Sequence, residues 1–234
     1  MKINYVIGAF LCVLGCYACS SPKTEVQSPD GHIKMTLTVD ENGKPFYNVS
    51  VDDSLLIENS AMGFTAANGI ILAEGFQVKN TTFSSEDETW TQPWGENKKN
   101  RNHYNEMAVS LTNEDQVQLT LRFRVFDDGI GFRYEYTVPT VDSLLITDEL
   151  TTFRFHRDGT SWSIHASAET YELLYQQQPI SEVETANTPF TFKTADGVYG
   201  SIHEAALYDF PEMTLKQIGH YTLKAELAPW PDGI

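Results

Sequence analysis

The densest group of chemically capable side chains lies between Glu88 and Glu106, in the segment ETWTQPWGENKKNRNHYNE. A ligand with many hydroxyl groups needs aromatic faces for stacking and planar polar groups for hydrogen bonds. This segment supplies both in the side chains of Trp90, Trp94, Arg101, Asn102, His103 and Asn105. It is therefore a candidate sugar site. The alternative is that the tryptophans pack beneath the loop while Arg101 pairs with a nearby carboxylate.

A second set of candidates consists of carboxylates toward the C-terminus, namely Glu169, Glu172, Glu204, Asp209 and Glu212. Two carboxyl groups on either side of a glycosidic bond can hydrolyse it. Several oxygen ligands can instead bind a hard cation such as calcium. The sequence has no D-x-[DN]-x-[DN]-G loop, so a calcium site would gather ligands from distant segments. The alternative for each carboxylate is a solvated surface position.

Other catalytic patterns receive little support. His203 and Glu204 are adjacent, and neighbouring residues on a strand point to opposite faces. The zinc motif H-E-x-x-H would also need a second histidine where Leu207 stands. No G-x-S-x-G nucleophile motif and no glycine-rich phosphate loop occurs.

Composition narrows the possible classes of function. The chain has 234 residues, a net charge of −16 and 41% hydrophobic residues, enough for a sizeable core. Its acidity argues against nucleic-acid binding, which needs a basic face to neutralise phosphates. All three cysteines, Cys12, Cys16 and Cys19, precede residue 20, which excludes disulfides, thiol catalysts and cysteine-ligated zinc from residues 20–234.

The N-terminus predicts export. Residues 1–19 combine a lysine, an apolar run and a cysteine-containing end, which is typical of a lipoprotein signal peptide. Acylation of Cys19 or Cys16 would anchor the protein to a membrane; the alternative is a plain secretory signal with incidental cysteines. Residues 20–27 are predicted to be a tether, and residues 28–234 a single β-sandwich domain.

The elements that must position these groups are predicted to be strands. Ile33–Val39 alternates apolar and polar residues, and Phe46–Val51 returns after an Asn-Gly turn. Val117–Phe126 and Ile130–Val138 form the clearest hairpin, expected at the centre of a sheet. Glu88–Glu106 is predicted to be mostly loop. Without any amphipathic helix, the pattern favours an all-β sandwich of about 14–18 strands.

Four motifs in order carry a resemblance to a known family. They are ETW-x-x-PWGE-x-K-x-x-RNHYNE, FRVFDDGIGFRYEY, GVYGSIHEAALYDF and the initial SPDG. From residue 28 to about 230, the chain resembles the N-terminal domain of glycoside hydrolase family 97. The resemblance implies a large β-super-sandwich of the galactose-mutarotase kind, preceding a (β/α)8 barrel. It also implies calcium-dependent α-glucosidases or α-galactosidases of the periplasm or outer membrane.

The family resemblance places the catalytic acid and base on the barrel, and this chain shows no alternation of strands and long helices. No catalytic residue is therefore expected here, and the chain is expected to be inactive alone. The resemblance assigns one calcium ligand to this domain, and Glu172 takes its position, with Glu169 as the fallback. The segment departs from the family pattern at His165, where a proline is usual, and lacks the usual Gly-Asp pair.

The main hypothesis is thus the N-terminal sandwich of a calcium-dependent α-glycosidase, packed on a barrel in cis. The alternatives are a stand-alone carbohydrate-binding surface lipoprotein and a structural surface protein without a ligand. The sequence ends at Trp-Pro-Asp-Gly-Ile, as if cut at a domain edge, and the isolated chain is expected to self-associate. On this hypothesis, Trp90, Trp94 and Arg101 brace the sandwich and its contact with the barrel. Substrate-binding residues, glucoside or galactoside preference, and inversion or retention stay open.

Overall fold

The computed structural model describes residues 23–67, 69–139, 141–167, 169–208, 210 and 212–228. These ranges contain 19 strands and one short 3-10 turn, η1 (Ile180–Glu182). The strands form five antiparallel sheets. The predicted all-β fold is confirmed, with slightly more strands than expected. Within these ranges, no helix has the length and apolar character needed to span a membrane.

The first sheet has the order β1-β2-β3-β4, made of β1 (Glu25–Gln27), β2 (Ile33–Val39), β3 (Pro45–Val51) and β4 (Ser54–Ala61). The predicted β2–β3 hairpin is present, and its alternation buries Met35 and Leu37. Gly43 in its turn has a φ of +74° and lies against the chain near β7; a Cβ there would be 2.3 Å from the Phe76 nitrogen. The turn therefore requires glycine at this position.

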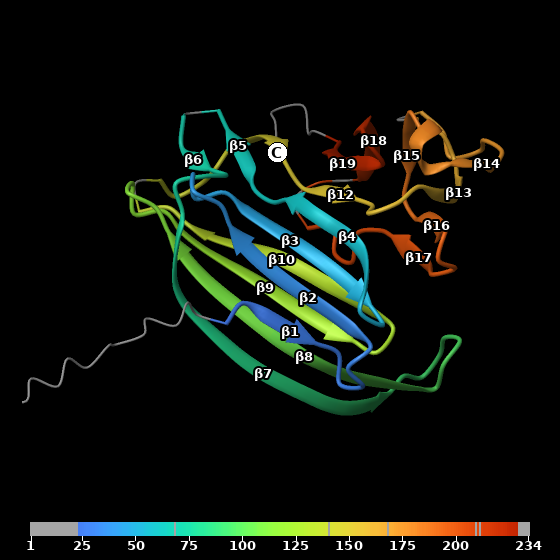
Figure 1. Ribbon diagram of the computed structural model, residues 1–234, viewed down its shortest axis with the longest axis horizontal. Helices are drawn as coiled ribbons and strands as arrows, with labels where there is room; N and C mark the ends of the chain where they lie inside the picture. Colours follow the sequence, from blue (N-terminus) through green and yellow to red (C-terminus); the bar gives the residue numbers. More distant parts are fainter. Residues whose placement is uncertain are drawn as a thin grey trace, which may run out of the picture.

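The second sheet has the order β10-β9-β8-β7, made of β7 (Gln77–Thr91), β8 (Lys99–Thr112), β9 (Gln118–Phe126) and β10 (Gly129–Thr137). The predicted β9–β10 hairpin is present, with β9 internal and β10 at the edge of the sheet. The first sheet lies over the second (Figure 1). Tyr47 and Phe132 meet between them, with ring centroids 5.5 Å apart.

The prediction of loop across Glu88–Glu106 is wrong, because β7 and β8 continue as a paired hairpin almost to its tip. Pairing runs from Gln77 with Thr112 to Thr91 with Lys99. Polar residues lie on both faces of this hairpin, so its sequence has no alternation of apolar and polar residues from which the strands could be predicted. We call residues 84–105 the arm; most of its β7 side is exposed.

Three smaller sheets complete the molecule, and Figure 1 shows β13–β17 together at the right. One sheet has the order β11-β5-β6, with β5 (Phe64–Ala66), β6 (Ile71–Leu72) and β11 (Ile146–Glu149). Another has the order β12-β19-β18-β15, with β12 (Thr152–Arg154), β15 (Thr185–Asn187), β18 (Met213–Gly219) and β19 (Thr222–Leu227). The last has the order β14-β13-β16-β17, with β13 (Gly159–Ser163), β14 (Gln176–Pro179), β16 (Phe190–Thr194) and β17 (Tyr199–Ile202).

Buried side chains from all these sheets form one continuous hydrophobic cluster. It extends from Met35 in the first sheet through Phe123 in the second to Phe190 and Leu215 near the C-terminus. The sheets are therefore parts of one packed body that holds the connecting loops in place.

Candidate functional site

The predicted calcium ligand Glu172 lies on the loop between β13 and β14, and its side chain is exposed. The Glu172 backbone N–H donates to Thr170 Oγ1 at 3.0 Å. The fallback ligand Glu169 repeats this arrangement, with its N–H donating to Ser167 Oγ at 3.3 Å. These local bonds shape the loop and leave both carboxylates facing solvent.

The neighbouring Tyr171 lies close to the segment before β18. Hydrogen bonding to the Glu212 carboxylate raises the pKa of Tyr171, with smaller contributions from its partial burial and from the charge of Glu204. The structure therefore brings Tyr171, Glu204 and Glu212 together beside Glu172. In the described part of the chain, the buried Oε1 atom of Glu212 has no hydrogen-bond partner.

Glu204 has a structural role in this region. Its Oε2 accepts a hydrogen bond of 2.5 Å from Thr188 Oγ1, and its Oε1 accepts one of 3.3 Å from the Met213 backbone N–H. The carboxylate thus fastens the end of β17 to the starts of β16 and β18. The preceding His203 is exposed and bonds through Nδ1 to the Glu204 carbonyl oxygen at 2.8 Å, so the two side chains do not form a joint site.

Within residues 23–228, apart from the undescribed positions, no group of three or more His, Cys, Asp or Glu side chains is arranged to hold a metal ion. A calcium ion takes about six to eight oxygen ligands. Glu172 can contribute at most two of them. Asp209, Cys16 and Cys19 lie outside the described residues.

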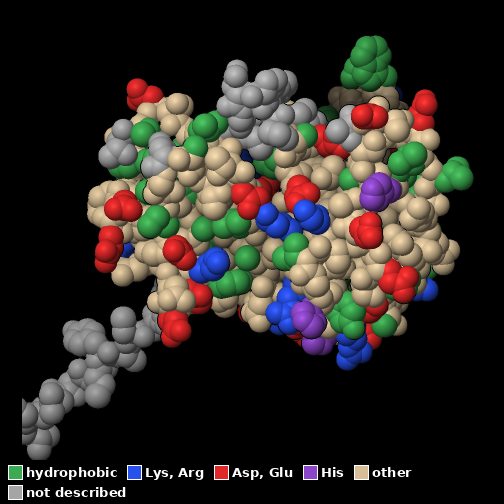
Figure 2. All heavy atoms as spheres, turned by 90° about the horizontal axis from the view of Figure 1, so that it is seen from above, with side chains coloured by type: hydrophobic (Ala, Val, Ile, Leu, Met, Phe, Trp, Pro, Cys, Tyr) green, Lys and Arg blue, Asp and Glu red, His purple; other side chains and the backbone are tan. Residues whose placement is uncertain are grey.

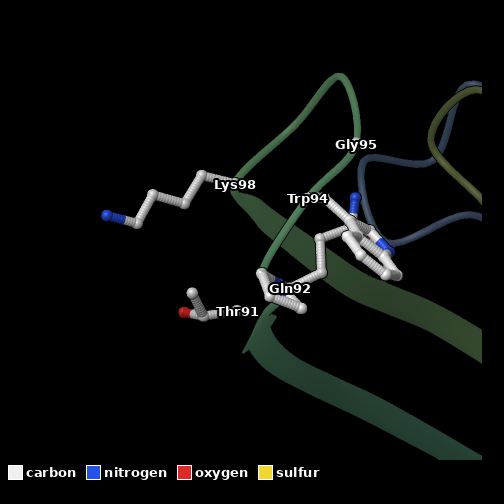
Figure 3. Close-up of a pocket in the computed structure, with 6 residues that line it drawn as sticks. Thr91, Gln92, Trp94, Gly95 and Lys98 are labelled. Atoms are coloured by element: carbon white, nitrogen blue, oxygen red, sulfur yellow. The ribbon is translucent and has the colours of Figure 1, made fainter.

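The two tryptophans of the β7–β8 hairpin, Trp90 on β7 and Trp94 at the tip, are exposed to solvent. Trp90 is 50% exposed and Trp94 is 86% exposed. The alternative that they pack beneath the loop is therefore wrong. That they brace the contact with a barrel stays a prediction. A shallow hollow at the tip is lined by Thr91, Gln92, Pro93, Trp94, Gly95 and Lys98. Figure 3 shows the side chains of Trp94 and Gln92 next to each other, with Lys98 pointing away from them.

The tip has a defined shape because Gln92 spans it. The Gln92 Nε2 group donates to the Asn97 carbonyl oxygen at 2.8 Å, and the Gln92 backbone N–H donates to the Lys98 carbonyl oxygen at 3.1 Å. Gly95 has a φ of +118°, and a Cβ there would be 2.5 Å from Gln92 Nε2. The amide of Gln92 is therefore already committed to the loop.

The planar polar groups of the arm do not converge on one point. Arg101 donates two hydrogen bonds to Asp87, as the alternative interpretation of this segment predicted. Asn102 lies on the opposite face of the hairpin, where its Nδ2 donates to Glu88 Oε1 at 3.0 Å. Asn105 donates to the Gln27 carbonyl oxygen at 2.9 Å. Five of the six residues proposed for the sugar site are thus divided between the two faces of the hairpin, and Trp94 lies at its tip.

Charged side chains on the outer face of the second sheet form a ladder that sequence reasoning missed. Arg122 Nε donates to Glu135 Oε1 at 2.8 Å, and Arg122 Nη1 donates to Glu106 Oε1 at 2.5 Å. Arg124 Nε donates to Glu106 Oε2 at 2.8 Å. Hydrogen bonding from Arg122 lowers the pKa of Glu135 to about 2, although partial burial opposes the shift. The ladder joins three strands, so it is structural.

A second missed feature is a pair of aromatic rings on the C-terminal sheet. Trp162 and Tyr199 have ring planes within 16° of each other and centroids 6.4 Å apart. The rings come from β13 and β17, and the strand between them, β16, had to be placed before the rings could be paired.

Large apolar side chains are exposed on the Glu172 loop and on the segment between β17 and β18. Leu174 is 89% exposed, and Tyr208, between β17 and β18, is 88% exposed. Hydrophobic side chains protrude at the right of Figure 2, the side on which Figure 1 places β13 and β14. An exposed carboxylate beside exposed apolar groups is typical of a contact surface.

Comparison with known proteins agrees with this architecture. A family model described as Glycosyl-hydrolase 97 N-terminal matches residues 26–230. A curated relative, a retaining alpha-galactosidase of Bacteroides thetaiotaomicron, is 23% identical over 243 residues, covering 98% of this chain and 36% of the relative.

Solved structures show the same fold. A glycoside hydrolase family 97 enzyme from Pseudoalteromonas sp. strain K8 superposes with a TM-score of 0.82 and 38% identity, over 89% of this chain and 32% of that one. That enzyme has been solved in complex with panose and with acarbose. A beta-arabinopyranosidase with a TM-score of 0.76 and 21% identity shares the fold. The chain thus spans about a third of the length of these relatives.

Proposed function

The chain belongs to the glycosyl-hydrolase 97 N-terminal family, and on this basis we propose that it is the N-terminal β-sandwich of a calcium-dependent α-glycosidase. In this proposal it packs on a (β/α)8 barrel in cis, and the barrel carries the catalytic residues. The substrates are α-linked glucosides or galactosides. The proposal is supported by the match over residues 26–230 and by relatives about three times as long.

Glu172 contributes a carboxylate to the calcium in this proposal. The fit rests on an exposed carboxylate on a loop flanked by exposed apolar side chains, where another part of a larger protein can supply the remaining ligands. Calcium bound there would orient and electrostatically assist the carboxyl groups that react at the anomeric centre. Tyr171, the sequence neighbour of Glu172, lies close to Glu212 in the segment before β18.

The test compares substitutions in a protein that carries this domain together with a barrel of the family. We expect Glu172→Gln to raise the calcium concentration needed for hydrolysis of p-nitrophenyl α-glucoside or α-galactoside by at least about tenfold. Glu169→Gln is the matched control on the same loop and should change little. An equal effect of both substitutions, or of neither, would remove Glu172 from the role. Hydrolysis by the 234-residue chain alone would contradict the placement of the chemistry on a barrel.

A second candidate function is a stand-alone carbohydrate-binding surface lipoprotein. The exposed aromatic side chains of Trp94 and Tyr199 favour it. It predicts heat on titration of the chain with maltooligosaccharides or galactosides, with or without calcium. A structural surface protein predicts no heat in any titration.

We also propose that the protein is exported and anchored through Cys19 or Cys16, to the periplasmic side of a bacterial membrane. The support is the apolar run that ends in small residues and cysteines. A palmitate analogue should label the protein in an exporting bacterium. One of the two substitutions Cys19→Ser and Cys16→Ser should abolish this labelling, and the other should leave it intact. Labelling that survives both substitutions, or that never occurs, would leave a plain secretory signal.

A further inference from the structure

The outer face of sheet β14-β13-β16-β17 has an unusual composition. Alternation along β13 buries Ser161 and Ser163 and turns Trp162 outward. The strand register places outward side chains in two rows across the sheet. One row is Gln177, Trp162, Thr191 and Ser201; the next is Pro179, Thr160, Lys193 and Tyr199.

Two aromatic rings lie on this face. Tyr199 is 64% exposed, and its ring plane is within 16° of that of Trp162, at a centroid distance of 6.4 Å. Because the planes are nearly parallel, the pair presents ring faces in one common orientation. The Lys193 Nζ atom lies 5.0 Å from the centroid of the Tyr199 ring, so its charge is held at the aromatic pair.

The polar groups beside the rings are not used by the protein. Among the described residues, no side-chain hydrogen bond or ion pair involves Gln177, Thr191 or Ser201. The row therefore offers an amide, an indole and two hydroxyl groups side by side, about 5 Å from strand to strand. Amide and hydroxyl groups each both donate and accept hydrogen bonds, as the hydroxyl groups of a sugar do.

The charge of this face is also distinctive. Of the eight outward side chains, Lys193 alone is charged, whereas the whole chain has a net charge of −16. An anionic ligand would be repelled by the protein as a whole, and a cationic one would find no carboxylate in these rows. The complementary ligand is uncharged, has hydroxyl groups and has an apolar flat side.

The sheet is stiff enough to hold these groups in position. Its inner face packs Phe192 against Phe155, with ring centroids 4.8 Å apart. Gly200 lies directly beneath the Phe192 ring, where a Cβ would be 2.4 Å from Cζ. The outward groups therefore stand on packed strands, which preorganise a site better than loops do.

We propose that this face is a glycan-binding surface, on which an uncharged α-linked oligosaccharide stacks a sugar ring on Trp162 or Tyr199. Its hydroxyl groups bond to the Gln177 amide and to the Thr191 and Ser201 hydroxyls. This goes beyond the proposed function, because it uses neither Glu172 nor calcium. It would hold a glycan on the N-terminal domain itself.

The test titrates the 234-residue chain with maltohexaose and with stachyose, followed by calorimetry and tryptophan fluorescence. We expect saturable binding to at least one of the two sugars. Tyr199→Ala and Trp162→Ala should each weaken it by at least about tenfold, and Tyr199→Phe should retain most of it. Tyr208→Ala, which removes a ring that is 88% exposed on the segment between β17 and β18, is the control and should change nothing.

Two further measurements distinguish this proposal from the proposed calcium site and from a loss of binding caused by misfolding. Chelation of calcium and Glu172→Gln should leave this binding unchanged, whereas both should impair the proposed hydrolase site. Ser201→Ala and Thr191→Val preserve shape and should also weaken binding.

The proposal is overturned if no sugar binds saturably, or if the Tyr199 and Thr191 variants bind as well as the original chain. It is also overturned if the chain self-associates in light scattering, binds no sugar, and becomes monomeric on Tyr199→Ala, since the face would then be a protein interface.

Discussion

Arg101 donates two hydrogen bonds to Asp87 across the β7–β8 hairpin, from Nε to Oδ1 and from Nη2 to Oδ2, each 2.7 Å long. Both side chains are more than half exposed. The hydrogen bonds from Arg101 lower the pKa of Asp87. The pair aligns the arm, yet water and salt screen it.

Removing this exposed ion pair should therefore reduce the stability of the fold only slightly. We expect Arg101→Ala to change the thermal midpoint slightly, with the difference vanishing at high salt. In contrast, Glu106→Gln should lower the free energy of unfolding by about 1–3 kcal/mol. The substitution weakens the hydrogen bonds that this buried side chain accepts from Arg122 and Arg124. Thermal and urea melts of both variants at low and high salt check this, and a larger cost for Arg101→Ala would contradict it.

The lowered pKa of Glu135 should make the stability of the fold depend on pH in the acid range. Its pKa falls from 4.5 to about 2 through hydrogen bonds from Arg122 and then Arg133, opposed by partial burial. A depressed pKa stabilises the fold above pH 4.5, and this contribution is lost as the pH falls toward 2. Urea melts between pH 6 and pH 2 should show a shallower loss of stability in Glu135→Gln than in the original chain. Parallel curves for the two proteins would rule out this contribution.

Glu149 should behave in the opposite sense. Burial raises its pKa, the neighbouring Asp148 adds to the shift, and the Thr151 hydrogen bond and Lys224 oppose it. The protonated form is favoured in the fold, so stability declines as the pH rises through the unfolded value of 4.5. Glu149→Gln should therefore stabilise the chain by about 1 kcal/mol at pH 7 and by much less at pH 4. Destabilisation at pH 7 would show that the carboxylate is needed there.

Trp94 should be dispensable for folding. With 86% of its surface exposed, Trp94→Ala is expected to change the free energy of unfolding by less than about 0.5 kcal/mol. The same substitution should remove the tryptophan fluorescence that acrylamide quenches most readily. A clear loss of stability would contradict this prediction and indicate that Trp94 supports the sandwich.

Two glycines in turns offer a matched pair of substitutions. Both have positive φ, +74° at Gly43 and +82° at Gly31. Around Gly31 nothing lies within 4 Å of a Cβ, whereas at Gly43 the backbone of Phe76 is 2.3 Å away. We expect Gly31→Ala to cost about 1 kcal/mol from backbone strain alone, and Gly43→Ala to cost more than about 3 kcal/mol. Equal costs in denaturant melts would contradict the close approach at Gly43.

The sequence predicts what depends on local pattern. Alternation with a central Asp-Asp-Gly turn predicted β9 and β10, and Asn-Gly predicted the turn between β2 and β3. The arm was missed because its β7 side is exposed and its β8 side is buried only at Tyr104, so no apolar period runs along it. The pairing of Trp162 with Tyr199 depends on long-range strand order, which alternation does not encode.

The candidate site divides in the same way. The exposure of Glu172 follows from its charge, whereas the 89% exposure of Leu174 on the same loop could not be predicted from an apolar side chain. The structural role of Glu204 could not be predicted, because its partners Thr188 and Met213 come from segments that meet only in the folded chain. The convergence of Tyr171 with Glu212 has the same origin.

The position of β7 at the end of its sheet has a consequence for solubility. Along the arm, β7 leaves a row of backbone N–H and C=O groups available to any strand that approaches. Glu86, Asp87 and Glu88 stand in succession along this edge, and all three are exposed. A second copy that paired edge to edge would bring these like charges together, which disfavours the pairing. This acidic run thus works as a gatekeeper that protects a long, open strand from aggregation.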